Sequence, residues 1–358
     1  PGELPVAIEA TGGVVVDRLL AAGHPVVAVH PNAFWAARPR WGTSRAKSDR
    51  GDSFKLADYL RTDGHRLRRL RPSCPVTAGL VALSRMRDDH VEARVAATNQ
   101  LAALLGRHWP GAVVVFARLD SAIALAFLED YPTPASAERL GEARMAMFCR
   151  RHSYSGRRSP VELVARLRSA PRATEELAAA TLARLVATQV GVLRTLMGSI
   201  AQLDRALETA LTRHPKATLL ESLPRVGVVN LAQLLAEVGP ILDRAADVEH
   251  ASSEIGATPV TRESGRSRTV HFRWAANTGA RRALGIFADN SRHASPWAAQ
   301  LYQQARSRGQ RHPQAIRVLM RAWLRVIWAC WQTDTAYNPA RHGAERRLAQ
   351  QHSKETAA

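Results

Sequence analysis

One long stretch without proline constrains the fold of this chain more than any other feature. No proline interrupts the sequence between Pro171 and Pro215. A continuous helix over this stretch would be ~60 Å long, at ~1.5 Å per residue. Apolar residues recur within it at alternating steps of three and four, the spacing of a coiled-coil seam; they are Leu193, Leu196, Ile200, Leu203 and Leu207. Because a small domain cannot cover so long a seam, we expect it to pack on a second subunit.

The pattern of apolar residues divides the chain into four regions. Residues 1–75 alternate short strands and helices, and 76–215 are a helical linker that contains the coiled-coil seam. Residues 216–340 form a mostly helical domain, and the polar tail is 341–358. The predicted fold class is therefore α/β plus α. Further predicted elements are strands at 5–8 and 24–31, helices at 14–22 and from Lys47, a buried strand or helix at Gly111, a basic loop at 256–268, and two amphipathic helices after it.

The charge of the chain points to a nucleic-acid partner. Fifty Lys and Arg residues against thirty-one Asp and Glu residues give a net charge of +19, and only four of the fifty are lysines. The guanidinium fork of arginine can bind phosphate through two hydrogen bonds. The alternative is a ribosome-like or merely soluble basic protein. No apolar run reaches the ~20 residues of a membrane span, and the three distant cysteines indicate a reduced compartment.

Three carboxylates are candidates for a metal site. Glu9 follows an apolar strand at the point where a Thr-Gly-Gly turn begins, and α/β folds place functional groups at such strand ends. Asp49 and Asp52 are three residues apart, which puts them on one face of a helix. Converging carboxylates repel one another unless a cation lies between them, and oxygen ligands suit Mg²⁺. The alternative for Asp49 is a helix cap.

A second candidate site is the basic serine loop near residue 264. Gly265 allows a close approach of the backbone to phosphate, and Arg262, Arg266 and Arg268 flank Ser264. A serine hydroxyl in this setting is a candidate nucleophile, with Ser267 as its rival. The alternative is a solvated turn that contacts phosphate without chemistry. The tryptophans that follow are Trp323, Trp328 and Trp331, and their helical spacing favours the core over base stacking.

Several segments, in order, resemble the DEDD-type transposases of the insertion sequence 110 family. In the first region these are "AIEATGG", "VVAVHP" and "KSDRGDSFKLADYLRTD", with the basic "RLRRLRP" after them. In the third region they are "LPRVGVVNLAQLLAEVG", "IGATPVTRESGRS" and the segment that begins "SPWAAQLYQQARSRG". The resemblance covers nearly the whole chain.

The resemblance implies a RuvC-like RNase H fold in residues 1–75, with four acidic residues that hold Mg²⁺ or Mn²⁺. Glu9 matches the glutamate of this tetrad, and Asp49 and Asp52 match its last two aspartates. The first aspartate belongs to an opening strand that has no match here. We therefore expect that a segment is missing before Pro1.

The resemblance also implies a mechanism and partners. Ser264 matches the serine nucleophile of the family, which recombines DNA under the guidance of a structured RNA. Arg225 stands where the family has a glycine, in a turn that faces phosphate. Lys47, Arg68 and Arg69 are further candidate contacts to nucleic acid. We expect a dimer, with four copies on DNA, located in the bacterial cytoplasm with the nucleoid. The alternatives are a metal-dependent junction nuclease that uses only carboxylates and water, and an inactive nucleic-acid-binding remnant.

Overall fold

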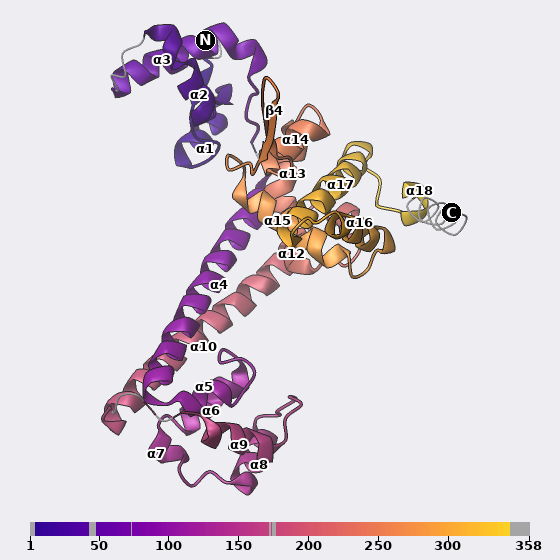
Figure 1. Cartoon of the computed structure of the whole chain (residues 1–358). Coiled ribbons are helices and arrows are strands. Elements are labelled where there is room, and N and C mark those ends of the chain that lie inside the picture. The colour runs from indigo at the N-terminus through magenta and orange to yellow at the C-terminus, as the bar shows by residue number, and fades with distance from the viewer. Residues whose placement is uncertain (1–3, 43–47, 73, 172, 174–176, 344–358) are drawn as a thin grey trace, which may run out of the picture. The chain divides into compact units, whose positions relative to one another are not determined.

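The computed structural model describes residues 4–42, 48–72, 74–171, 173 and 177–343 (Figure 1). The chain divides into two compact units. One unit combines residues 1–81 with 210–358, and the other is formed by residues 82–209. Within the described part of the chain, none of the helices has both the length and the apolar character needed to cross a membrane.

The N-terminal residues form a small parallel β-α-β unit. Strand β1 (Val6–Ile8) pairs with β2 (Val26–Ala28), and helix α1 (Val14–Ala21) connects them, because parallel strands need a crossover. The backbone N–H of Leu70 donates to the carbonyl of Val26 at 2.7 Å, which adds an antiparallel edge beside β2. The predicted strands and helix are thus confirmed. A complete RNase H sheet is not present in the part of the chain that the structure describes.

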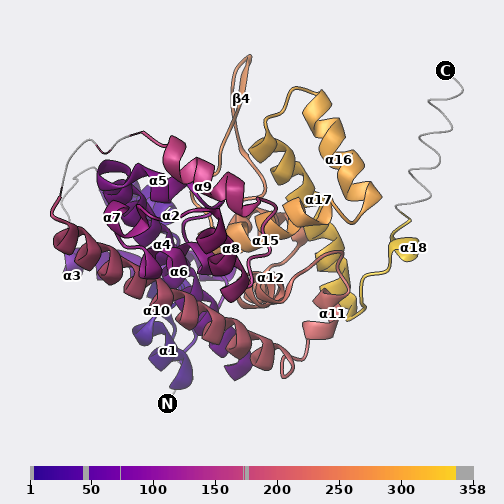
Figure 2. The same ribbon diagram turned by 90° about the horizontal axis from the view of Figure 1, so that it is seen from below.

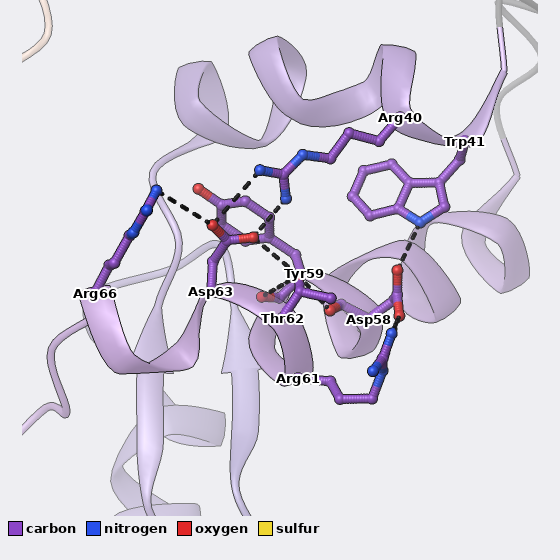
Figure 3. A network of polar contacts seen from close by, with 8 residues as sticks. All are labelled: Arg40, Trp41, Asp58, Tyr59, Arg61, Thr62, Asp63 and Arg66. Atoms are coloured by element: carbon purple, nitrogen blue, oxygen red, sulfur yellow. Dashed lines mark hydrogen bonds and ion pairs between the residues drawn. The ribbon is translucent and has the colours of Figure 1, made fainter.

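Four further elements complete this region: α2 (Pro31–Ala37), the 3₁₀ turn η1 (Arg38–Trp41), α3 (Asp49–Asp63) and the 3₁₀ turn η2 (Gly64–Arg66). A polar network ties η1 to α3 (Figure 3). The indole N–H of Trp41 donates to Asp58 Oδ2 at 2.9 Å, and Arg40 forms an ion pair with Asp63. The hydrogen bond from Arg40, with help from Thr62, lowers the pKa of Asp63 to about 2. The network fixes α3, whose first turn carries Asp49 and Asp52.

Two long helices run side by side in opposite directions through the second unit (Figures 1 and 2). They are α4 (Pro75–His108) and α10 (Ala179–Leu211). Arg87 Nε lies 2.5 Å from Asp204 Oδ1, and the side-chain amide of Gln189 donates to the carbonyl of Ala97 at 2.8 Å. The shorter helices between them are α5 (Pro110–Val114), α6 (Ala122–Asp130), α7 (Pro134–Ala137), α8 (Glu142–Arg151) and α9 (Pro160–Ser169). The ambiguous apolar run that begins at Gly111 is therefore helical up to Val114, and its last three residues lie outside the helix.

The predicted need for a second subunit to cover the seam was wrong. Leu193 and Leu207 are fully buried within the single chain, and Ile200 is 7% exposed. Leu193 belongs to one apolar cluster with Leu101 and Leu105 of α4, and Leu196 packs against that cluster. The sequence pattern identified the buried face of the helix correctly. It could not show that α4, almost a hundred residues earlier, supplies the covering surface.

The C-terminal region is mostly helical, with one β-hairpin. Its elements are α11 (Ala217–Glu221), α12 (Val228–Gln233), the π-helical turn η3 (Leu234–Val238), α13 (Gly239–Arg244), α14 (Val248–Ile255), β3 (Val260–Ser264), β4 (Ser267–His271), α15 (Thr278–Ser291), α16 (Pro296–Ser307), α17 (His312–Thr333) and α18 (Pro339–His342). Three amphipathic helices follow the hairpin, α15 to α17, where two were predicted.

Tryptophans of α17 help to build the core of this region, as predicted. Trp323 is fully buried, and its indole N–H donates to Ser291 Oγ at 2.8 Å. Trp331 is 6% exposed, and its N–H donates to Asp243 Oδ1 at 2.8 Å. Each indole buries a large apolar ring and satisfies its single donor, so these two residues are structural. Trp328 is half-buried.

Candidate functional site

The candidate nucleophile lies at the tip of a β-hairpin. The basic segment was predicted to be a loop, but β3 and β4 pair over five residues each. Gly265 and Arg266 form the two-residue turn. Gly265 has a φ of 55°, whereas the φ of Arg266 is negative. Glycine at the first position of such a turn is typical of type II′, which matches the twist of the flanking strands. The glycine therefore sets the hairpin in addition to leaving space beside Ser264.

The register of the hairpin sorts its side chains onto two faces. Ser264 lies directly opposite Ser267, and Arg262 lies opposite Thr269. Because successive side chains of a strand alternate, these four residues share one face. Glu263 lies opposite Arg268, where Nε of the arginine and Oε1 of the glutamate are 2.9 Å apart. Arg268 thus lies on the face opposite to Ser264, in an ion pair, and does not flank the serine as predicted.

The surroundings of Ser264 supply positive charge, and the one histidine of the hairpin, His271, shares its face but hydrogen-bonds to Thr269 at 2.9 Å. Ser264, Arg262 and Arg266 are all exposed. Within the described part of the chain, the Ser264 hydroxyl has no hydrogen-bond partner, and neither arginine has a carboxylate partner. A serine hydroxyl is a weak nucleophile at neutral pH unless a base or a metal activates it. The described contacts of the Ser264 hydroxyl include no such group, so an activating group has to be brought to it when DNA is bound.

The three candidate carboxylates lie at a strand end and a helix start. Glu9 directly follows β1 and is exposed, and Asp49 is exposed in the first turn of α3. The cap of α3 is Ser48, whose hydroxyl accepts the N–H of Gly51 at 3.1 Å. The capping alternative for Asp49 therefore does not hold, and its carboxylate is not used as the N-cap.

Asp52 is already engaged with cations of the protein. Arg38 Nη2 lies 2.5 Å from Asp52 Oδ2, and Lys55 Nζ lies 3.7 Å from Oδ1. Among the residues that the structure describes, no three His, Cys, Asp or Glu side chains come together as a metal-binding group. The predicted convergence of Glu9, Asp49 and Asp52 is thus not seen among the described residues, and Asp52 pairs with Arg38.

The chemistry of the donors nevertheless fits a hard cation. All three side chains offer oxygen, the ligand that Mg²⁺ and Mn²⁺ prefer. Asp52 Oδ1 is buried and accepts no hydrogen bond in the described part of the chain. A buried oxygen that accepts no hydrogen bond is costly. Lys55 Nζ, at 3.7 Å, is too far away to donate one, and a metal ion in direct contact would satisfy the oxygen. The residues fit the metal in type, although they do not form a metal-binding group in the described part of the chain.

The remaining candidate contacts differ in their surroundings. Arg225 is exposed and has a φ of 58°, the left-handed conformation that glycine adopts easily. The turn therefore keeps a geometry suited to glycine although arginine occupies it. Arg68 is exposed and donates from Nη1 to the carbonyl of Arg244 at 3.0 Å. Arg69 is exposed beside it, and Lys47 lies outside the described residues.

Sequence reasoning missed an aromatic and arginine group where β4 ends. Phe272 and Trp274 follow the strand, and the guanidinium groups of Arg281 and Arg317 lie over the ring of Phe272. The segment "HFRWAAN" signalled this group, because it places two aromatic residues beside an arginine in a polar stretch. The two distant arginines gave no such signal.

Comparisons with known proteins identify the family of the chain. Residues 1–110 match the model of the DEDD transposase family of IS110, and residues 217–303 match that of the transposase IS116/IS110/IS902 family. The mini-circle putative transposase for IS117 of Streptomyces coelicolor is 32% identical, over 94% of this chain and 83% of that protein. An insertion element IS110 protein of the same species is 30% identical, over 82% of this chain and 72% of that protein.

A third relative comes from a different genus. An insertion element IS900 protein of Mycobacterium paratuberculosis is 28% identical, over 95% of this chain and 85% of that protein. The matches span both the region of Glu9, Asp49 and Asp52 and the region of the Ser264 hairpin. The chain therefore belongs to the IS110 family of transposases.

Proposed function

We propose that this transposase cuts and rejoins DNA through attack of the Ser264 hydroxyl on a phosphodiester. The observation that carries the proposal is an exposed serine at the tip of a hairpin whose face and turn carry unpaired arginines. In the first step the Ser264 Oγ–P bond forms and the P–O bond to one deoxyribose breaks. The hydroxyl loses its proton, and the departing deoxyribose oxygen gains one. Attack of another DNA end on the phosphoserine reverses these changes and rejoins the strand.

The neighbours of Ser264 have distinct roles in this proposal. Arg262 shares the face of the serine, so its guanidinium would hold a non-bridging phosphate oxygen and stabilise the charge that develops there. Arg266 would contact the neighbouring phosphate from the turn. A Cβ at Gly265 would meet nothing within 4 Å, so its benefit lies in the turn geometry and in open access for DNA.

The acidic residues provide the activation that the hairpin lacks. Glu9, Asp49 and Asp52 would hold Mg²⁺ or Mn²⁺, which when bound promotes loss of the serine proton and neutralises charge on the phosphate. The role of Arg38 is to neutralise Asp52 in the absence of other cations. We expect Arg38→Gln to tighten Mn²⁺ binding, measured by titration calorimetry, and Asp52→Asn to weaken it. Unchanged affinity in both variants would remove these residues from the proposed metal site.

A structured RNA and further copies of the chain complete the proposed complex. Both rest on the resemblance of the chain to its family, and the excess of arginine suits an RNA as well as a DNA backbone. We propose a dimer that becomes a tetramer on DNA, in the bacterial cytoplasm with the nucleoid. Light scattering with and without nucleic acid measures the assembly, and a monomer under both conditions would contradict it.

The direct test is formation of a covalent protein–DNA adduct. The protein is incubated with guide RNA, Mg²⁺ and labelled DNA, and then denatured. We expect labelled wild-type protein, and no label on Ser264→Ala. Cleavage without an adduct would favour the metal-dependent nuclease that uses water. Binding without cleavage at any metal concentration would favour the inactive remnant.

A further inference from the structure

An aromatic pair follows the last strand of the serine hairpin, which is the β3–β4 hairpin that carries Ser264. The rings of Phe272 and Trp274 have centroids 4.9 Å apart and planes 79° apart. Trp274 is 82% exposed, the largest value among the large apolar side chains that the structure describes. One exposed apolar residue is ordinary on a protein surface. The charged groups around Phe272 make this one different.

Two guanidinium groups lie over the same phenylalanine ring. Arg281 Cζ is 4.7 Å from the ring centroid of Phe272, and Arg317 Cζ is 5.1 Å from it. Arg281 is fixed in place, because its Nη2 donates to the carbonyl of Arg273 at 2.6 Å. The same Nη2 lies 2.2 Å from the position that a Cβ on Gly256 would occupy, so only glycine leaves room for it.

Arg317 lacks the partners that hold Arg281. It is half-buried, and among the described residues it has neither a carboxylate nor a hydrogen-bond acceptor. Burial lowers the pKa of both arginines, and the charge of Arg317 lowers that of Arg281 further. Two positive charges that face one ring without a counter-charge repel each other. An anion beside them would be stabilised.

We propose that Trp274 and Arg317 form a nucleotide-binding site for unpaired DNA next to the serine hairpin. The base stacks on the exposed indole of Trp274, and the phosphate of the same strand meets Arg317. Both residues contact Phe272, so the two distances to that ring limit their separation. This site rests on the proposed function and deepens it, because it specifies DNA with an unpaired base as the substrate of the serine hairpin.

The chemistry favours an unpaired base over a duplex. The grooves of a duplex present base edges, which hydrogen-bonding side chains read, whereas base faces are hidden in the stack. An indole gains most from the flat face of a base, and such stacking contributes about 1–3 kcal/mol per base. Ser264 and Trp274 are joined through β4, so the proposed nucleotide site and the proposed nucleophile belong to one continuous segment of the chain.

The test compares single-stranded with fully paired DNA of one sequence, bound to the whole protein. We expect Trp274→Ala to weaken single-strand binding by about 5- to 150-fold, the loss of one stacked base. Trp274→Phe should restore most of the affinity, and binding to the duplex should change little. The control is Trp35→Ala, which removes a 57% exposed tryptophan from α2. It should leave single-strand affinity unchanged.

Arg317 is tested through the salt dependence of binding. Arg317→Ala should reduce the slope of log K against log salt by about 0.7, the value for one phosphate of a single strand, whereas Arg317→Lys should keep it. Trp274→Ala should leave the slope unchanged. Equal losses on single-stranded and paired DNA, or no loss at all, would overturn the site. Dependence on Trp274 only with RNA of the same sequence would also overturn it.

The outcome separates this site from the serine chemistry. If Trp274→Ala shows the single-strand loss and no wild-type adduct forms, the nucleotide site stands and the proposed reaction fails. If Trp274→Ala binds single strands as wild type does and still forms the adduct, the reaction stands and the nucleotide site fails.

Discussion

Ser264 and Ser267 lie directly opposite each other where β3 and β4 meet the Gly265–Arg266 turn. Two hydroxyls that differ by only three residues in sequence therefore present themselves on the same face. Arg262 is on that face as well, whereas Arg268 lies on the opposite face with Glu263. Because both serines lie on one face, the geometry of the hairpin does not distinguish them, and substitutions at each position are needed.

The first prediction concerns the arginines of the hairpin. Arg262→Ala should weaken DNA binding and lower the salt slope by about one, because it removes one phosphate contact. Arg268→Ala should have a smaller effect, since Glu263 already neutralises this residue. Binding measured at several salt concentrations decides the matter. Equal slopes for both variants would mean that the faces do not differ toward DNA.

The second prediction concerns the α4–α10 pair. Leu193→Asp places a charge in a fully buried position, so we expect the helical unit to lose several kcal/mol of stability, on the order of 3–5. The control is Leu185→Asp on the same helix, where the leucine is 43% exposed. It should change stability little. Helical circular dichroism during urea unfolding measures both. If the Leu193→Asp protein is instead folded and monomeric, the result would indicate that the seam packs between subunits.

The third prediction uses the strained turn at Arg225. A left-handed residue with a Cβ costs about 1 kcal/mol or more, and glycine relieves most of that strain. Arg225→Gly should therefore raise the Tm slightly, while DNA affinity and salt slope fall because a cation is lost. Arg225→Ala should lower affinity without the gain in Tm. If Arg225→Gly leaves affinity unchanged, the arginine makes no contact with phosphate.

The fourth prediction concerns acid stability of the N-terminal region. The pKa of Asp63 is lowered to about 2, below its ordinary 3.8, by its hydrogen bond from Arg40. A lowered pKa in the folded state adds stability above the ordinary pKa, and this stability is lost as the pH falls from about 4 to about 2. Asp63→Asn should flatten the decline in urea midpoint over this range. An equally steep decline in the variant would assign it to other carboxylates.

How far the sequence predicts this protein depends on the distance between partners. Strands β1 and β2, helix α1 and the helix that begins near Asp49 follow from local apolar spacing, and the structure confirms them. The hairpin was missed because its two strands are exposed. Exposed strands need no alternation of apolar and polar residues, so the sequence carried no strand pattern on either side of Gly265. The packing of Leu193 with residues of α4 was also missed. The spacing of apolar residues along one helix shows which face is buried, but it does not identify the helix that packs on that face. The pairing of Asp52 with Arg38 was missed for the same reason.

The most direct test of the account is to locate the bond between protein and DNA. The denatured adduct is digested with protease and nuclease, and the modified peptide is sequenced by mass spectrometry. Ser264 and Ser267 are distinguishable, because cleavage after Arg266 places them in different peptides. We predict a nucleotide phosphate on Ser264, and an adduct in Ser267→Ala but not in Ser264→Ala. A nucleotide on Ser267, or DNA recombination by wild-type protein that never forms an adduct, would contradict the assignment of Ser264 as the nucleophile.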